Sequence, residues 1–136
     1  MKEIEEILSE FNFLEDWEDK YQHLIDLGKH LEPLDEKYKN EKYKLKGCQS
    51  TVYFVTKDNS DGTISFFANS DAFIVQGLIA LLLKVYSNKT AERILETNIS
   101  FLSEIGLESH LSPTRKNGLS AMLNKIKAEA NLRINK

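Results

Sequence analysis

The stretch TVYFVTKDNSDGTISFFANSDAFIVQGLIALLLKVY, residues 51–86, decides the fold. Residues 51–56 and 63–68 are rich in β-branched and aromatic side chains, and Asp58–Gly62 between them has the composition of a hairpin loop. Residues 72–86 are apolar around most of a helical circumference, which predicts a helix at the centre of the core. The stretch therefore predicts an α+β fold.

A third antiparallel strand is expected at residues 43–46, just before this stretch. A three-stranded antiparallel sheet cannot bury both of its faces alone, so helices must cover at least one face. Upstream, apolar residues at helical spacing predict an N-terminal helix with Ile4, Ile7, Leu8 and Phe11 on its buried side. A second helix is expected from an Asp16 cap to a stop at Gly28, followed by an irregular connector over 31–41.

Helix start and stop signals also divide the C-terminal third of the chain. Thr90 is expected to cap a short helix, and Gly106 to end another over 101–105. Ser112 followed by Pro113 marks the start of the last helix. Because no linker or internal repeat interrupts these elements, residues 1–136 are expected to form a single domain.

Composition narrows the class of function. Lys and Arg number 18 against 21 Asp and Glu, so the net charge of -3 gives no basic face of the kind that binds nucleic acid. No apolar run is long enough to span a bilayer, and the acidic start of the chain does not resemble a secretory signal. The sequence therefore predicts a cytoplasmic protein, in a compartment where thiols stay reduced.

The chain has one cysteine, Cys48, at the edge of a predicted strand. A single thiol forms no internal disulfide and no thiolate metal site, but it can act as a nucleophile. Gly47 before it and Gln49 and Ser50 after it form a turn with little bulk around the sulfur. Lys44, Lys46 and Arg115 are expected to favour the thiolate and so lower its pKa. The alternative is a small buried hydrophobic residue, and from these features both interpretations carry equal weight.

Three more side chains are candidates for the same site. His110, just before the last helix, is a candidate general base, although a histidine there can simply form loop hydrogen bonds. Arg115, in the first helical turn, opposes the helix dipole and so requires an anion. This anion could be the carboxylate of Asp71 or Glu108, an anionic sulfur species, or a carboxylate of a partner protein. Asp71 is first of all a residue that complements the dipole of the helix over 72–86.

Three separated segments together resemble the SufE family. They are residues 47–53, 69–80 and 106–122, and the likeness extends in order from about residue 12 to residue 130. The fold that the resemblance implies, several helices around a small antiparallel sheet, is shared with iron–sulfur scaffolds of the IscU kind. Such scaffolds hold their cluster with three cysteines, so one cysteine disfavours that function. The departures from the family pattern are Tyr53, Asn69 and Gln76.

The resemblance implies a sulfur carrier and not an enzyme in its own right. The implied partner is a cysteine desulfurase of the SufS or CsdA kind, which holds pyridoxal phosphate (PLP), and this chain is expected to bind no cofactor itself. Cys48 would accept sulfur from the desulfurase persulfide and pass it to an iron–sulfur scaffold.

By the same resemblance, Gly47, Gln49, Ser50, Asp71, His110 and Arg115 would support the loop or contact the partner. The family's cysteine loop holds its sulfur in an apolar pocket and swings outward on docking. Two other functions stay open: an interaction module that does not use its thiol, and a hydrolase built on Cys48 and His110.

Overall fold

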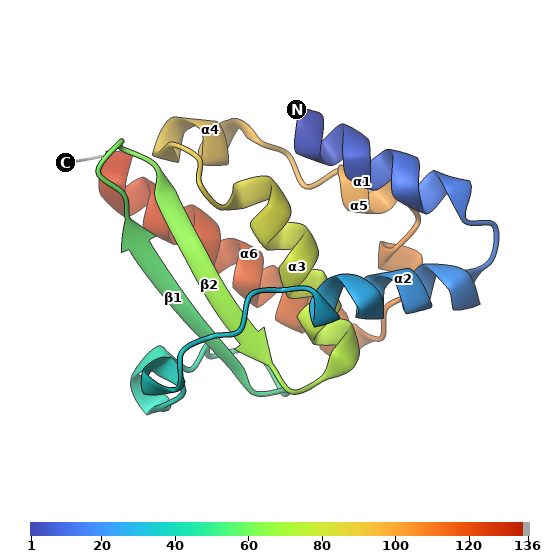
Figure 1. Ribbon diagram of the computed structural model, residues 1–136, viewed down its shortest axis with the longest axis horizontal. Helices are drawn as coiled ribbons and strands as arrows, with labels where there is room; N and C mark the ends of the chain where they lie inside the picture. Colours follow the sequence, from blue (N-terminus) through green and yellow to red (C-terminus); the bar gives the residue numbers. More distant parts are fainter. Residues whose placement is uncertain (135–136) are drawn as a thin grey trace.

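The computed structural model describes residues 1–134 and has a β-hairpin at one side of the molecule (Figure 1). Strands β1 (Val52–Asp58) and β2 (Ile64–Ser70) pair antiparallel, with Val52 opposite Ser70 and Asp58 opposite Ile64. Both strands extend two residues beyond the predicted ends. The predicted hairpin loop is confirmed, and Gly62 supplies its positive φ of 88°.

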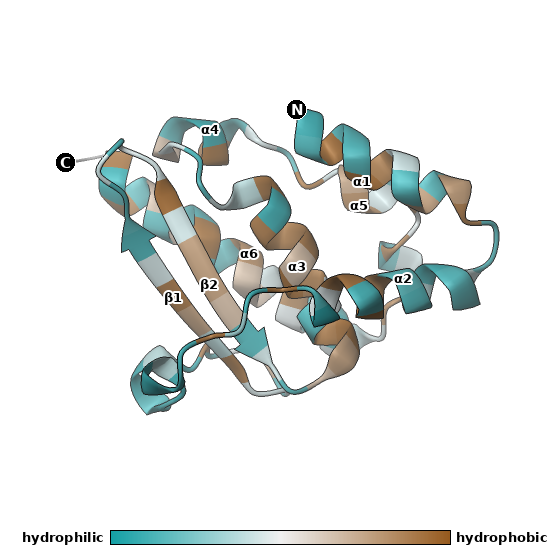
Figure 2. Ribbon diagram, in the orientation of Figure 1, coloured by the Kyte–Doolittle hydropathy of each residue, from teal (hydrophilic) through white to brown (hydrophobic). Residues whose placement is uncertain are grey.

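Helix α3 (Phe73–Tyr86) forms the centre of the core, as predicted. It packs between the hairpin and helix α2 (Trp17–Lys29), and Figure 2 colours much of its ribbon brown, for hydrophobic residues. Helices α2 and α3 approach very closely, because a Cβ atom added to Gly77 would lie 2.3 Å from the Leu24 carbonyl oxygen. The prediction that Gly28 ends α2 is wrong, because the helix continues to Lys29. Its missing side chain instead makes room for Gly77.

The remaining helices lie where the sequence predicted them, and α4 and α6 begin at the predicted start signals. They are α1 (Lys2–Phe13), α4 (Ala91–Glu96), α5 (Phe101–Glu104) and α6 (Pro113–Ile134). Asp16 caps α2 through the Asp19 amide at 2.9 Å, and Thr90 caps α4 through the Arg93 amide at 3.2 Å. No helix within residues 1–134 has both the length and the apolar content that a bilayer span requires.

The prediction of a third strand over 43–46 is wrong: within residues 1–134 the sheet has two strands. Two 3-10 turns, Glu36–Tyr38 and Glu41–Tyr43, occupy the connector. The Asn40 side chain accepts a hydrogen bond from the Lys42 amide at 2.9 Å, which holds the second turn, and Gly47 bends the chain at a φ of 91°. Between this segment and β1, the only β-type pairing within residues 1–134 is an isolated bridge from Lys44 to Tyr53.

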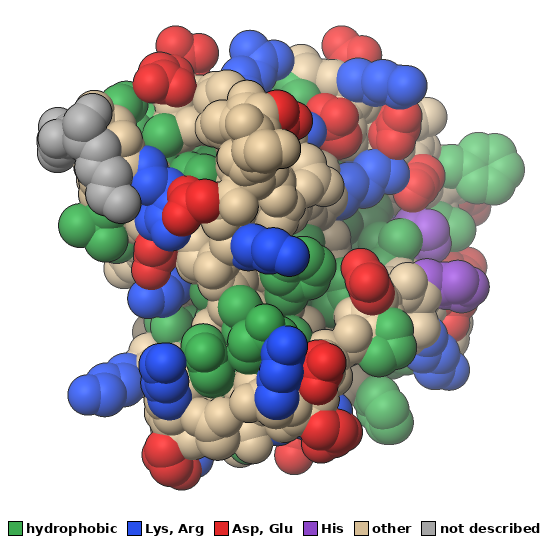
Figure 3. Space-filling model, turned by 60° about the vertical axis from the view of Figure 1, so that its left-hand side comes forward, with side chains coloured by type: hydrophobic (Ala, Val, Ile, Leu, Met, Phe, Trp, Pro, Cys, Tyr) green, Lys and Arg blue, Asp and Glu red, His purple; other side chains and the backbone are tan. Residues whose placement is uncertain are grey.

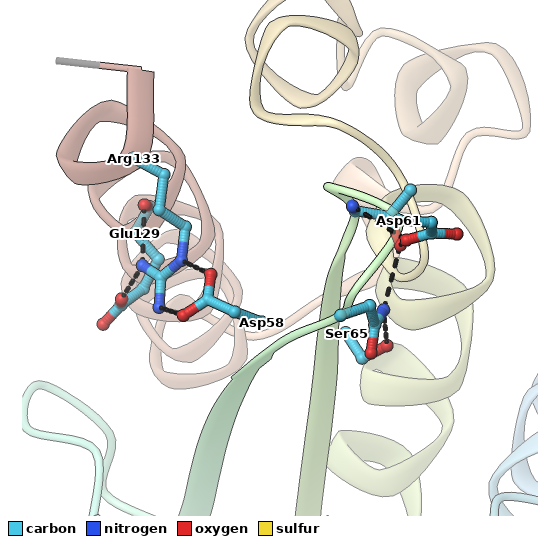
Figure 4. Close-up of polar contacts among 7 residues, drawn as sticks. Asp58, Asp61, Ser65, Glu129 and Arg133 are labelled. Atoms are coloured by element: carbon cyan, nitrogen blue, oxygen red, sulfur yellow. Dashed lines mark hydrogen bonds and ion pairs between the residues drawn. The ribbon is translucent and has the colours of Figure 1, made fainter. Parts of the chain in front are cut away.

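A charged cluster joins the far end of β1 to α6 (Figure 4). The Arg133 guanidinium donates to the Asp58 carboxylate, at 3.2 Å from Nη2 to Oδ2, and to Glu129 Oε2 at 2.7 Å from Nη1. Lys125 Nζ lies 2.8 Å from Glu129 Oε1. The hairpin is therefore tied to α6 at the end opposite Cys48.

Candidate functional site

The two ends of the loop that carries Cys48 lie side by side at the start of β1. The Leu45 amide donates to the Val52 carbonyl at 2.8 Å and closes the loop over residues 46–51. Gly47 has a φ of 91°, and a Cβ atom placed on it would lie 3.4 Å from the Ala121 Cβ of α6. Glycine is required there because the loop turns in the left-handed region while lying against α6.

The Cys48 side chain lies between the loop and α6 and is half-buried. Its Sγ lies 3.8 Å from the Gly118 carbonyl oxygen, a weak sulfur hydrogen bond. The thiol borders a cavity of about 20 Å³, enough for one water-sized group. The cavity wall comes from the loop, α3 and α6, with Gln49, Ser50, Val75, Leu78, Thr114, Arg115, Gly118, Leu119 and Met122 lining it.

Burial raises the pKa of the Cys48 thiol above its usual value. The expectation that Lys44, Lys46 and Arg115 lower this pKa is therefore wrong. Lys44 pairs with Glu41 at 3.7 Å, and the cavity wall is largely apolar. In this conformation the thiol is protonated at neutral pH.

Arg115 lines the same cavity as Cys48, from the first turn of α6, and its side chain is exposed. Within residues 1–134, no ion pair joins Arg115 to Asp71 or Glu108, so these two predicted partners are excluded. The Glu108 carboxylate instead accepts from the Ser103 hydroxyl at 2.9 Å. The guanidinium thus remains open to an anion from outside.

His110 belongs to a separate cluster. Its ring stacks on Trp17 with centroids 3.6 Å apart, and Nδ1 lies 3.1 Å from the Gly106 carbonyl oxygen. The Tyr21 hydroxyl donates to the His110 carbonyl. His110 is not among the residues that line the Cys48 cavity, so the structure does not assemble a cysteine–histidine pair.

Asp71 is exposed in the short segment between β2 and α3. Because the preceding Ser70 pairs with Val52, Asp71 lies at the same end of the hairpin as the Cys48 loop. It borders a different depression, however, with Phe73 and Gln76. It precedes the first turn of α3, which contains no acidic residue, so it complements the helix dipole less directly than predicted.

Sequence reasoning missed two structural roles, one in the segment beside the site and one in the cavity itself. Gln76 anchors the segment before α3, since its Oε1 accepts from the Ser70 amide at 2.8 Å. Gly118 and Met122 contribute to the cavity from a helix that is distant in the chain. Helical periodicity identifies Met122 as buried but does not reveal that a loop packs on it. Within residues 1–134, no group of three or more His, Cys, Asp or Glu side chains is placed to hold a metal ion.

The fold and site define a class of protein: small α+β domains that hold a single thiol on a loop beside a two-stranded hairpin. Residues 5–130 match the model of SufE, the Fe-S metabolism associated domain. The chain therefore belongs to the SufE family, as its motifs indicated, and is associated with iron–sulfur metabolism.

Relatives support this membership along nearly the whole chain. An uncharacterized SufE-like protein of Rhizobium meliloti is 39% identical over 98% of this chain and 99% of its own length. One of Rhizobium etli is 41% identical over 98% of this chain and 93% of its own. The solution structure of a hypothetical protein from Thermus thermophilus has a TM-score of 0.78 at 22% identity, covering 98% and 97% of the two chains. That likeness concerns the fold.

Proposed function

We propose that this protein accepts sulfur from a PLP-dependent cysteine desulfurase, activates that enzyme, and passes the sulfur on for iron–sulfur cluster assembly in the cytoplasm. Cys48 is the acceptor, and the PLP belongs to the partner. The observation that carries the proposal is the position of Cys48, half-buried beside a cavity of about 20 Å³. Pockets for organic ligands measure roughly 300 to 1,000 Å³, so this cavity suits a single additional atom.

Positioning, and not acidity, is the expected source of reactivity. Lowering a thiol pKa from about 8.5 to about 7 raises the thiolate fraction at pH 7 roughly fifteenfold but reduces intrinsic nucleophilicity about fivefold. The net gain is only about threefold, whereas holding two reacting groups together is worth many orders of magnitude. A thiol whose pKa is raised by burial fits a protein that reacts only when docked.

The proposed step is a thiol exchange without net oxidation or reduction. The Cys48 thiolate attacks the outer sulfur of the partner's persulfide, forming one S–S bond while the partner's own S–S bond breaks. The partner's cysteine leaves as a thiolate and takes up a proton, and Cys48 becomes the persulfide. Arg115, on the wall of the same cavity, would stabilise the anionic persulfide by charge.

The direct test mixes the protein with a desulfurase, cysteine and PLP, and measures its intact mass. We expect wild-type protein to gain the mass of sulfur, which a reductant removes, and Cys48→Ser to gain none. Ser9→Ala, which changes an exposed serine of α1 outside the Cys48 cavity, serves as the control and is expected to gain sulfur.

Each competing function makes a different prediction in this system. If Cys48→Ser stimulated the desulfurase and supported sulfur uptake as well as wild type, the protein would be an interaction module that does not use its thiol. Catalytic turnover of activated esters would instead indicate a hydrolase. That alternative is already disfavoured, because His110 stacks on Trp17 and does not line the Cys48 cavity.

A further inference from the structure

The outer edge of β1 is partly uncovered, because the predicted third strand does not form. The Val52 carbonyl points away from β2, since it accepts from the Leu45 amide. Backbone groups alternate sides along a strand, so those of Phe54 and Thr56 point outward as well. Within residues 1–134, no hydrogen bond reaches the Thr56 amide or the Phe54 carbonyl on this edge. A donor and an acceptor therefore stand open side by side.

The Thr56 side chain supplies an independent sign of an incomplete site. Its Oγ1 atom is buried from solvent, yet it has no hydrogen-bond partner within residues 1–134. Such a hydroxyl is costly to leave unsatisfied, and native structures usually provide a partner. A bound ligand that brings a donor or acceptor to this edge would satisfy it.

A cleft of about 530 Å³ lies along the same edge. Residues 42–46 form one wall, Phe54 and Thr56 the floor, and Lys125, Glu129 and Arg133 of α6 the other wall. We call this the basic cleft. Its lining holds five basic side chains and one acidic one, in a chain whose net charge is -3. Figure 3 shows this side of the molecule, where basic side chains (blue) surround a hollow.

The charges on the two walls are not equally available. Glu129 is held by Lys125 and Arg133 on the α6 wall. On the other wall, Lys42 and Lys46 are exposed and form no ion pair within residues 1–134. Lys42 Nζ lies over the Tyr43 ring, 5.3 Å from its centroid. The positive charge outside the ion pairs therefore lies on the wall formed by residues 42–46.

We propose that the basic cleft binds an extended, acidic segment of a partner protein, which adds to β1 as a further strand. Edge addition supplies both missing backbone partners, and the lysines select for carboxylates. A second copy of this chain would bring the same lysines face to face. A nucleic acid would bring phosphates, which only accept hydrogen bonds, against the open Phe54 carbonyl. The acidic peptide segment is the occupant that fits both the charge and the hydrogen bonds.

The basic cleft adjoins the Cys48 loop directly. Residues 42–46 form its wall, and the Leu45–Val52 hydrogen bond at their end closes the loop. A partner held along β1 is thereby placed next to the start of the loop that carries Cys48. This binding site goes beyond the proposed thiol chemistry and does not require it, so Cys48→Ser is expected to keep it.

The test uses the full-length protein and a fluorescein-labelled short peptide of alternating glutamate and valine, followed by fluorescence anisotropy. We expect binding that weakens several-fold as salt rises from about 50 to about 300 mM. Amide shifts in ¹⁵N spectra should map to residues 42–46 and 54–58. A peptide with lysine in place of glutamate is expected not to bind. Cys48→Ser should bind like wild type, while it fails in sulfur uptake.

Two variants test the two halves of the proposal. Thr56→Pro removes the outward amide without breaking the pairing with β2, and should weaken peptide binding about three- to tenfold, the value of one backbone hydrogen bond. Lys42→Glu combined with Lys46→Glu leaves the strand intact and should abolish the salt-dependent binding. Lys2→Glu combined with Lys29→Glu, an equal change of charge outside the cleft, should leave binding unchanged. Circular dichroism checks that each variant is folded.

Several results would overturn the proposal. They are amide shifts confined to another surface, peptide binding that survives both charge reversals, or equal binding of the lysine peptide. Tighter binding of a single-stranded oligonucleotide than of the acidic peptide would identify a nucleic-acid site. A dimer in sedimentation that Lys42→Glu with Lys46→Glu disrupts would identify a second copy as the occupant.

Discussion

The Cys48 thiol is held by burial and not by a nearby positive charge. Because burial raises its pKa, the native protein has less thiolate at any given pH than the unfolded chain. We therefore expect the pH profile of alkylation by iodoacetamide to lie at higher pH in native protein than in urea-unfolded protein. Mass spectrometry of timed samples measures both profiles. A native profile at lower pH would mean that Lys44, Lys46 or Arg115 dominates after all.

Gly47 provides a second test at the residue scale. Gly47→Ala forces a side chain into a φ of 91° and should lower the free energy of unfolding by about 1 kcal/mol. Gly62→Ala is the matched control, since Gly62 has a φ of 88° but open space around it. Both should lose similar stability in urea denaturation. Only Gly47→Ala should speed Cys48 alkylation, because of the two strained glycines only Gly47 lies in the loop that holds Cys48 against α6.

The candidate site shows how much of its composition could be predicted from single residues of the sequence. Cys48 and Gly47 were identified from their local sequence, and Arg115 lies on the wall of the cavity that the thiol borders. The direction of the thiol pKa was predicted wrongly, because the nearby lysines are visible in the sequence whereas burial by Leu119 and Met122 is a tertiary effect. His110 was grouped with Cys48 for its chemistry, but its position is set by stacking on Trp17.

At the scale of elements, the crossing of α2 and α3 depends on Gly77. A glycine in a helix normally gains about 0.5 to 1 kcal/mol of stability when changed to alanine. Gly77→Ala should instead lose about 2 kcal/mol or more, because the new Cβ would lie 2.3 Å from the Leu24 carbonyl. Gly118→Ala, in α6, is the matched control and should gain stability as helical glycines normally do. Its new Cβ would lie no closer than 3.7 Å to a neighbouring atom, Cys48 Sγ. Chemical denaturation measures both, and a stabilised Gly77→Ala would contradict the close crossing.

Most elements were predictable because their signals are local. Asp16, Thr90 and the Ser112–Pro113 pair mark helix starts, and alternating β-branched and aromatic residues mark the hairpin. The third strand was predicted wrongly because the residues from Asn40 to Gly47 fold into a capped 3-10 turn and a glycine bend, which their β-prone composition does not reveal. The role of Gly28 depends on a second helix, which no local pattern contains.

At the scale of the whole molecule, Glu129 helps to join the hairpin to α6. Burial alone would raise the pKa of Glu129, but hydrogen bonds from Lys125 and Arg133 outweigh it and lower that pKa below the usual value. A lowered native pKa stabilises the fold above the unfolded-state pKa, and this stabilisation is lost as pH falls through the native pKa. The cluster thus contributes to stability at neutral pH and not in strong acid.

We therefore expect Glu129→Gln to unfold with about 1 kcal/mol less free energy at pH 7, and the difference to shrink below about pH 4. Urea denaturation at several pH values measures it. Glu104→Gln, which changes a carboxylate outside the ion pairs within residues 1–134, should show no such pH-dependent difference. A constant difference for Glu129→Gln across the range would show that charge is not its cause.

The half-buried sulfur gives this protein a built-in reporter of its own motion. Two copies can become covalently crosslinked only through Cys48, since the chain has no other cysteine. Each sulfur is half-buried against the Gly118 carbonyl, so we expect lifting of the loop from α6 to speed the crosslink. The rate at which a double-mass band appears on a non-reducing gel, under mild oxidant, is therefore expected to rise in a variant that loosens the loop, such as Gly47→Ala, without any label or partner.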